Sequence, residues 1–278
     1  MPEIPPPTGP ARRRRRLSDK ETEERMLAAA LGMINETGLT VSLEHLSLED
    51  VIREAGVARS AVYRRWPYKD LFFGDLLREL AKGGVPAEFG EESTQAATEI
   101  LRDRLDLLAT QEGRRTLFAE VLRTNRDFET VLRKSAWRTY LALHATFLSL
   151  DDGPLRDDVQ AALATAEEGF VARIADAHRT LAGLLGYRIK PETDADFEDL
   201  AALLNATLRG LLIMAPTSLR LTSKTLRANP FGVAESADWS HAAIALAAIE
   251  TAFLEPDPDV EWTEERLASV REAFAGLG

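Results

Sequence analysis

Apolar residues recur at helical spacing along most of the chain, beginning shortly after residue 17. In the first segment they stand three or four positions apart, at Met26, Leu27, Ala30, Leu31 and Ile34. Such spacing places them along one face of an α-helix. Ser18 can cap the start of this helix and Gly38 can end it, so we predict a helix over residues 18–38.

Three shorter helices are predicted next. Ser47 stands three residues before Asp50, which resembles a capping box and opens a helix through Ala55. Gly56 then supplies the positive φ of a tight turn. The two further helices are Ala58–Trp66, which Pro67 ends, and Lys69–Lys82, which precedes two glycines.

The helical pattern continues to the end of the chain, and no convincing alternation typical of a strand is present. Periodic segments cover residues 92–111, 114–124, 127–149, 157–186, 193–214, 238–254 and 262–276. Gly113, the 151–154 turn and the prolines at 256 and 258 separate some of them, and residues 216–238 are expected to form an irregular loop. We therefore predict an all-α fold.

A helix, a glycine turn and a short second helix placed after a longer first helix are typical of a helix-turn-helix unit. The second short helix would bury Val57, Val62 and Trp66. Its other side carries donors that can reach bases and phosphates, and further donors stand at the start of the short helix before it and of the helix after it. These donors are Ser47, Arg59, Ser60, Tyr63, Arg64, Arg65, Tyr68 and Lys69. The competing interpretation is a solvated basic surface without a partner.

The charged residues are distributed unevenly between the first 82 residues and the rest of the chain. The whole protein of 278 residues carries a formal charge of −11, which argues against a nucleic-acid partner. However, residues 1–82 contain 14 Lys and Arg against 13 Asp and Glu, whereas residues 83–278 contain 20 against 32. Only the first part is therefore expected to approach an anionic partner.

Residues 47–71 resemble the DNA-binding region of the tetracycline-repressor (TetR) family of bacterial transcription regulators. The matching positions are Ala55, Gly56, Val57, Val62, Tyr63, Trp66, Lys69 and Leu71. The resemblance implies that Tyr63 and Lys69 contact phosphates. Ala58 and Ala61 stand where the family often has Ser and Thr, which removes two hydroxyls, and Ile52 replaces a small residue.

The predicted organisation has three parts: a flexible basic arm (1–17), a helix-turn-helix DNA-binding domain (18–82), and a helical ligand-binding and dimerisation domain (83–278). The arm contains Arg12, Arg13, Arg14, Arg15 and Arg16. These arginines could enter a minor groove, or they could act only as a nonspecific electrostatic tether.

The resemblance implies that two helices of the larger part form a homodimer and that this part encloses a small-molecule pocket. Segments 193–214 and 238–254 are the candidates for the dimer helices because both are strongly apolar, although a buried helix pair would look the same. The ligand candidates lie on an aromatic stripe and at two further positions: Trp137, Tyr140, Leu141, His144 and Leu148, with Phe118 and Asn205. Most stripes of this kind are ordinary core, which is the competing interpretation.

Several function classes lack support. The chain has no cysteine, which excludes disulfides and thiolate metal sites and fits a cytoplasmic protein. It has no membrane-spanning apolar run and no common catalytic motif, and its four histidines are dispersed, so we expect no enzyme, cofactor or metal. The acidic pair Glu167 and Glu168 is expected on a solvated helix surface.

The sequence therefore predicts a homodimeric regulator that binds a near-palindromic double-stranded DNA operator, acting as a repressor released by a small hydrophobic or amphipathic effector. The alternative is a dimeric helical binding protein whose basic head docks an acidic protein partner.

Overall fold

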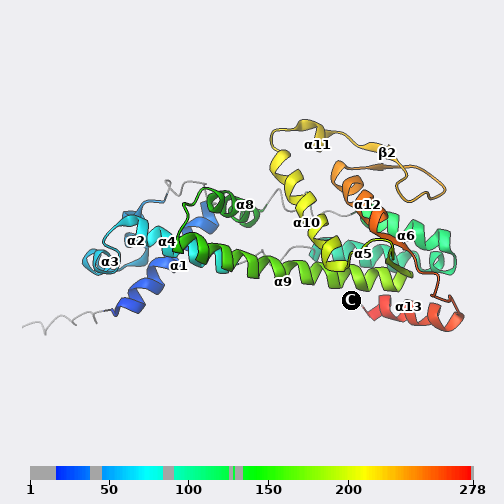
Figure 1. Ribbon diagram of the computed structural model, residues 1–278, viewed down its shortest axis with the longest axis horizontal. Coiled ribbons are helices and arrows are strands. Elements are labelled where there is room, and N and C mark those ends of the chain that lie inside the picture. Colours follow the sequence, from blue (N-terminus) through cyan, green and yellow to red (C-terminus); the bar gives the residue numbers. More distant parts are fainter. Residues whose placement is uncertain (1–16, 38–45, 84–90, 125–127, 129–133, 277–278) are drawn as a thin grey trace, which may run out of the picture.

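Most of the chain is α-helical, as its apolar spacing predicts (Figure 1). The computed structural model describes residues 17–37, 46–83, 91–124, 128 and 134–276. The helices are α1 (Asp19–Thr37), α2 (Leu48–Ala55), α3 (Arg59–Arg65), α4 (Lys69–Lys82), α5 (Glu91–Asp103), the 3₁₀ helix η1 (Leu105–Ala109), α6 (Gln111–Arg123), α8 (Ser135–Leu148), α9 (Pro154–Leu185), α10 (Phe197–Met214), α11 (Leu219–Ser223), α12 (His241–Phe253) and α13 (Glu264–Gly276).

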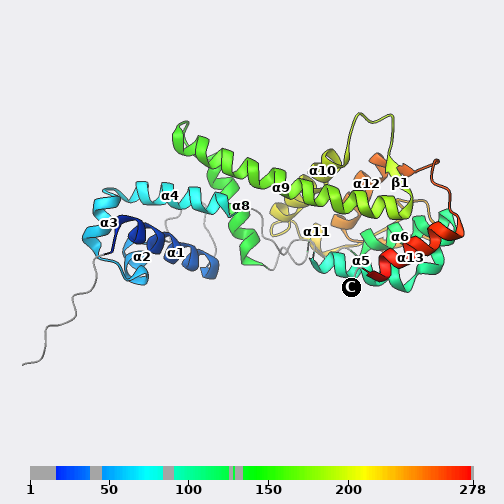
Figure 2. The same ribbon diagram turned by 90° about the horizontal axis from the view of Figure 1, so that it is seen from below.

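The molecule is elongated, with α1 to α4 at one end and a larger helical body at the other (Figures 1 and 2). The long helix α9 runs between them, and its first half packs against α4. The core of the four-helix head continues into the body through Leu143 of α8 and through Val159 and Leu163 of α9. A second core joins α5, α6, α10, α12 and α13 with the end of α9.

The two predicted helix caps of the head have different outcomes. Ser18 caps α1 as predicted: the Glu21 backbone N–H donates to the Ser18 hydroxyl at 3.1 Å, and the Ser18 N–H donates to the Glu21 carboxylate at 2.8 Å. Ser47 precedes α2 but its side chain makes no capping hydrogen bond. The capping-box prediction is wrong there because the Asp50 carboxylate accepts from Arg53 at 2.6 Å instead.

The segment predicted as one helix over 92–111 is divided into α5 and η1, and Gly113 lies inside α6 rather than before it. Thr110 caps α6 by accepting from the Gly113 N–H at 3.0 Å. A Cβ at position 113 would lie 2.1 Å from the Leu107 carbonyl oxygen. The glycine is therefore required by the close approach of η1, and not by a chain break.

Other helix starts also differ from the predicted ones. Pro154, expected in a separating turn, is the first residue of α9, where its missing N–H costs nothing. The helix expected from residue 127 begins at Ser135. The start of α10 is set by a capping box between Asp196 and Asp199, and the start of α12 by the Ser240 hydroxyl, which accepts from Ala243.

Four short strands correct the expectation of no β-structure: β1 (Tyr187–Ile189), β2 (Leu226–Ala228), β3 (Ala237–Trp239) and β4 (Leu254–Pro256). They form two antiparallel pairs, β1 with β4 and β2 with β3. A strand of three residues is too short to show an alternating pattern. The segment 216–238, expected to be irregular, contains α11, β2 and part of β3.

Among the residues that the structure describes, no helix is long and apolar enough to cross a membrane.

Candidate nucleic-acid interface

The turn between α2 and α3 has the geometry that the sequence predicts. Gly56 adopts a left-handed conformation with φ of 62°. Val51 of α2, Val62 of α3 and Trp66 are fully buried against the head core. The Trp66 indole N–H donates to the Asp75 carboxylate at 2.8 Å, and its ring meets Phe72 edge-on at 5.1 Å. These contacts fix the orientation of α3 relative to α4.

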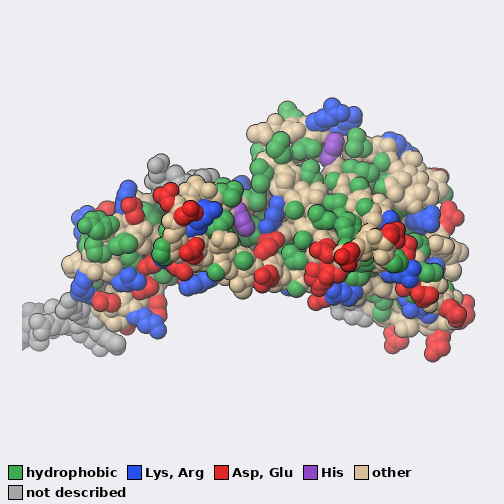
Figure 3. Space-filling view, in the orientation of Figure 1, with side chains coloured by type: hydrophobic (Ala, Val, Ile, Leu, Met, Phe, Trp, Pro, Cys, Tyr) green, Lys and Arg blue, Asp and Glu red, His purple; other side chains and the backbone are tan. Residues whose placement is uncertain are grey.

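The opposite side of α3 is exposed at the outer end of the head (Figure 1). It displays four predicted donors: Arg59, Ser60, Tyr63 and Arg64. Ser47 at the start of α2 and Tyr68 and Lys69 at the start of α4 are also exposed. Acidic side chains are interspersed with the basic ones over this end of the surface (Figure 3). Ala58 is the N-cap of α3 and makes no side-chain capping bond, as expected from the missing hydroxyl.

Arg65 differs from the other predicted donors because it is held inside the head. Its Nε donates to Glu23 of α1 at 3.1 Å, and its Nη2 donates to Asp75 of α4 at 3.3 Å. Its guanidinium also lies over the Trp66 ring at 5.2 Å. The hydrogen bond that Arg65 donates to Glu23 raises the pKa of Arg65. This side chain therefore links α3 to two neighbouring helices.

Carboxylates engage the exposed donors of α3. Glu49 Oε1 accepts from Arg59 Nη2 at 2.5 Å and from the Tyr63 hydroxyl at 3.0 Å. Arg64 pairs with Asp19. The hydrogen bond to Glu49 raises the pKa of Arg59. Two donors from successive turns of α3 thus converge on one carboxylate oxygen. Glu49 is not among the site residues that the sequence predicts.

The basic character of the first 82 residues comes from the arginine run. Residues 18–82 contain 9 Lys and Arg against 12 Asp and Glu, so the head without the arm is acidic. Arg12 to Arg16 lie outside the described residues. Any attraction of this head to an anion therefore depends on local arrangement and on the arm.

Three of the ligand candidates meet in the interior of the body. Trp137 and Tyr140 are buried, with ring centroids 5.4 Å apart, and the His144 ring lies 4.6 Å from Tyr140. Phe118 does not join them, because it belongs to the second core and stacks on Tyr187 at 5.1 Å.

Asn205, a further candidate, reaches the same region through a carboxylate. Glu167 of α9 accepts from Asn205 Nδ2 at 2.6 Å, from Arg209 Nη2 at 2.7 Å and from the Tyr140 hydroxyl at 3.0 Å. We call Tyr140, His144, Glu167, Asn205 and Arg209 the Glu167 cluster. Burial raises the pKa of Tyr140, whereas burial and the nearby Arg209 lower the pKa of His144.

Two members of this cluster were missed from the sequence. Glu167 was expected on a solvated surface, but it is half-buried and joins α8, α9 and α10. The available signal was on α10, where Asn205 and Arg209 stand four residues apart in a strongly apolar helix and therefore face the same side.

One face of α10 is apolar and exposed. Leu203, Ile213 and Met214 are 46%, 62% and 53% exposed, and the small residues Ala206 and Gly210 lie between them at helical spacing. The other side of α10 packs against α9 and α12. This strip lies on the predicted dimer segment 193–214.

Within the described ranges, no group of three or more His, Asp or Glu side chains is placed to hold a metal ion.

Comparisons with known proteins give only distant likenesses. No family model and no curated protein matches the chain. The reduced form of NemR from E. coli is 15% identical, with a TM-score of 0.42 over 86% of this chain and 100% of that one. SmeT, the repressor of the Stenotrophomonas maltophilia multidrug efflux pump SmeDEF, is 18% identical, with a TM-score of 0.38 over 87% and 96%. TylP, a TetR regulator from Streptomyces fradiae, is 16% identical, with a TM-score of 0.35 over 92% and 90%. At these values the likeness by itself assigns neither family nor function.

Proposed function

We propose that the chain is a DNA-binding transcription regulator of the TetR type. The observation that carries this proposal is that α3 has one buried apolar side and one exposed side with hydrogen-bond donors. Its inner side is fixed by Val62 and Trp66, while its outer side presents Arg59, Tyr63 and Arg64 to solvent. A rigidly held short helix with exposed donors is what the major groove admits.

Specific roles follow from where each donor lies. Arg59, Ser60 and Arg64 are proposed to contact base edges, since Arg can make bidentate bonds to guanine. Phosphate contacts are assigned to Ser47, Tyr63, Tyr68 and Lys69. Lys69 stands at the N-terminus of α4, where the helix dipole also favours a phosphate. Arg65 is given a positioning role, because its partners Glu23 and Asp75 belong to the head itself.

The basic arm is proposed to add phosphate contacts. Residues 18–82 are acidic overall, so Arg12 to Arg16 would supply much of the attraction to DNA. A plot of the logarithm of the DNA-binding constant against the logarithm of the salt concentration has a negative slope. Each phosphate contact that is lost makes this slope less steep by about 0.9. Deleting residues 1–16 should therefore weaken binding and flatten this slope, and an unchanged slope would exclude the arm.

We propose a homodimer built through α10 and α12. The exposed apolar strip on α10 needs a cover, and a second copy related by a two-fold axis would provide the same strip in return. The two α3 helices would then enter successive major grooves about 34–36 Å apart on a near-palindromic operator.

We further propose that the protein acts in the cytoplasm and represses transcription by occupying a promoter. A small effector would release it from the DNA. The Glu167 cluster, with Trp137, is the proposed effector site, since it combines apolar walls with a few buried polar groups. Phe118 lies in another core and is not included. An effector releases DNA only to the extent that it binds the DNA-incompetent arrangement more tightly.

The test is a selection of binding sites from a random duplex pool with the full chain, followed by titration of the selected duplex and a scrambled one at two salt concentrations. We expect an inverted repeat whose binding is weakened by Arg64→Ala and Tyr63→Phe but not by Arg123→Ala, which removes a charge from the body. Absence of enrichment, or equal affinity for the scrambled duplex, would contradict the proposal and leave docking to an acidic protein.

A further inference from the structure

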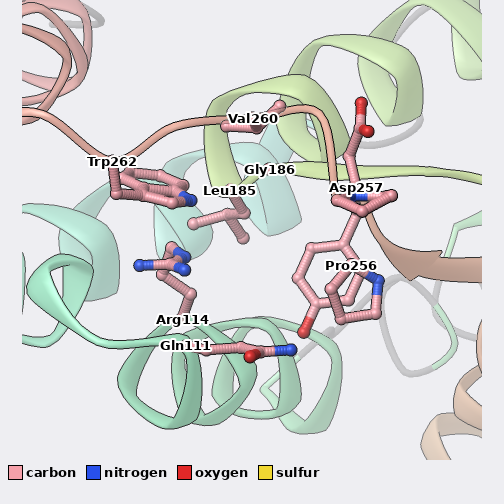
Figure 4. A pocket seen from close by; sticks show the side chains of 10 residues that line it. Gln111, Arg114, Leu185, Gly186, Pro256, Asp257, Val260 and Trp262 are labelled. Carbon is pink, nitrogen blue, oxygen red and sulfur yellow. The ribbon is translucent and has the colours of Figure 1, made fainter.

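A cavity of about 340 Å³ lies at the end of the molecule opposite α3. It is bounded by the first turn of α6, the end of α9 and the chain between β4 and α13 (Figure 4). Its walls include the polar side chains of Gln111, Arg114 and Tyr187 and the apolar side chains of Leu185, Val260 and Trp262. None of the DNA-binding or effector candidates is among these residues.

Arg114 is the unusual group in this cavity, because it is a buried cation without an anion. Only 8% of the residue is exposed, and its one hydrogen bond within the described part of the chain runs from Nη1 to the Leu108 carbonyl oxygen at 2.8 Å. Among the described residues, no carboxylate forms an ion pair with it or acts on its ionisation. Burial lowers the pKa of Arg114 for this reason. A buried charge is normally paired, so a partner is missing here.

A second guanidinium, that of Arg266, adds to the uncompensated positive charge beside the cavity. Trp262 has Arg114 at 3.8 Å and Arg266 at 5.0 Å from its ring centroid. Arg266 also opposes the protonation of Arg114. The Arg266 guanidinium donates to the Gly183 carbonyl oxygen at 2.9 Å, and this is its only hydrogen bond to the residues that the structure describes. Two cations therefore share one indole, and an anion bound beside them would relieve their repulsion.

The carboxylate that does line the cavity is used elsewhere. Asp257 Oδ1 accepts from the Asp259 backbone N–H at 3.0 Å and lies 3.5 Å from Arg188 Nη1. Figure 4 shows this carboxylate directed away from Arg114. Asp257 thus leaves the charge of Arg114 without compensation.

The remaining walls hold Trp262 in place over Arg114. Gly186 has φ of 70°, and a Cβ there would lie 2.8 Å from Cζ2 of Trp262. The indole therefore packs directly on the backbone at the end of α9. The Arg114 guanidinium lies over this ring and bonds to Leu108 through Nη1, so its Nε and Nη2 N–H groups stay available to a ligand.

We propose that this cavity binds a small organic carboxylate with a flat apolar body. The carboxylate would accept the edge N–H groups of Arg114, whose fork matches its two oxygens. The positive end of α6 adds to the attraction, since Gln111 and Arg114 both belong to its first turn. The apolar body would lie against Trp262, Leu185 and Val260, and a volume of about 340 Å³ accommodates a single substituted ring.

The test is isothermal titration calorimetry of the full chain with sodium benzoate in the absence of DNA. Benzamide serves as the uncharged analogue and inorganic phosphate as an anion without an apolar body. We expect benzoate to bind at least about tenfold more tightly than either one, because a charge-assisted bond contributes at least that factor. Arg114→Gln should weaken benzoate by a similar factor, whereas Arg123→Gln, at the other end of α6, should leave it unchanged.

A second variant keeps the test independent of any effect of Arg114 on folding. Val260→Phe retains both arginines but fills the cavity from a half-buried wall position, and it should abolish benzoate binding while the far-ultraviolet circular dichroism stays unchanged. Absence of benzoate binding, equal binding of benzamide or phosphate, or full binding by Arg114→Gln would each overturn the proposal. Because no DNA is present, these outcomes do not depend on the proposed regulatory function.

Discussion

Glu167→Gln tests whether the Glu167 cluster holds the body together. The substitution keeps the shape of the side chain and removes its charge. The structure records Glu167 as the acceptor for Arg209 Nη2, while the buried Nε of Arg209 has no partner among the described residues. The variant therefore leaves a guanidinium that is only 16% exposed without an ionised acceptor.

The expected loss lies between two limits. Removing one partner of a fully buried pair costs about 3–5 kcal/mol, whereas an exposed pair contributes about 1 kcal/mol or less. The Glu167 side chain is 31% exposed, so water screens part of the charge. The glutamine carbonyl oxygen can still accept up to two of the three hydrogen bonds, but without a negative charge. We therefore expect the free energy of unfolding to fall by about 2–3 kcal/mol.

Urea unfolding of the full chain measures this change, and Glu168→Gln is the matched control. Glu168 is the next residue of α9, carries the same charge and is exposed. Its substitution should change the free energy of unfolding by less than about 0.5 kcal/mol. Replacing Arg209 by Met in the Glu167→Gln background should recover part of the loss, because it removes the stranded charge. Equal effects of the two glutamine variants would refute the reasoning.

Three further predictions concern separate parts of the chain. Glu49→Gln should raise DNA affinity a few-fold in fluorescence anisotropy, because it frees the two α3 donors that this carboxylate holds, and Glu54→Gln on the same helix should raise it less. Burial lowers the pKa of His144 below 6.5, so the unfolded chain takes up the proton first as the pH falls. The stability contributed by neutral His144 is therefore present above about pH 6.5 and lost below it, and His144→Gln should flatten the fall in urea-unfolding free energy between about pH 7 and 5. Gly113→Ala should lower the thermal unfolding midpoint and cost about 2 kcal/mol or more, since its Cβ would lie 2.1 Å from a carbonyl oxygen, whereas Gly169→Ala meets nothing within 4 Å and should be neutral or stabilising.

The sequence predicted the head more completely than the body because its signals there are local. Gly56, Pro67 and the apolar pattern of α2 and α3 act within a few residues, and they are sufficient to place Val62 and Trp66 inside and Tyr63 outside. The role of Arg65 could not be predicted in this way. It depends on Glu23 and Asp75, which reach it from helices whose relative positions are set by tertiary packing.

In the body the decisive contacts join residues far apart in the chain. Glu167 meets Asn205 and Arg209 across 38 and 42 positions, so its burial depends on the packing of α9 against α10. The stripe of Trp137 and Tyr140 was identified, but helical spacing alone cannot separate a core stripe from a ligand wall. The strands were missed for a related reason: β1 pairs with β4 across more than 60 residues, and neither has enough residues to show a pattern.

The helix α9 connects all of these features. Its 32 residues span about 48 Å at 1.5 Å per residue. Asp158 near its start is bonded to Arg78 of α4 at 2.8 Å, Glu167 lies near its middle, and Leu185 at its end lines the distal cavity. A ligand in the distal cavity can therefore act on the head by favouring one position of this helix over another. A ligand at the Glu167 cluster can also act through α8, whose Leu143 belongs to the head core. Thermodynamic reciprocity makes that dependence measurable from both ends: a ligand that weakens operator binding by a given factor must itself be bound more weakly, by the same factor, when the operator is present.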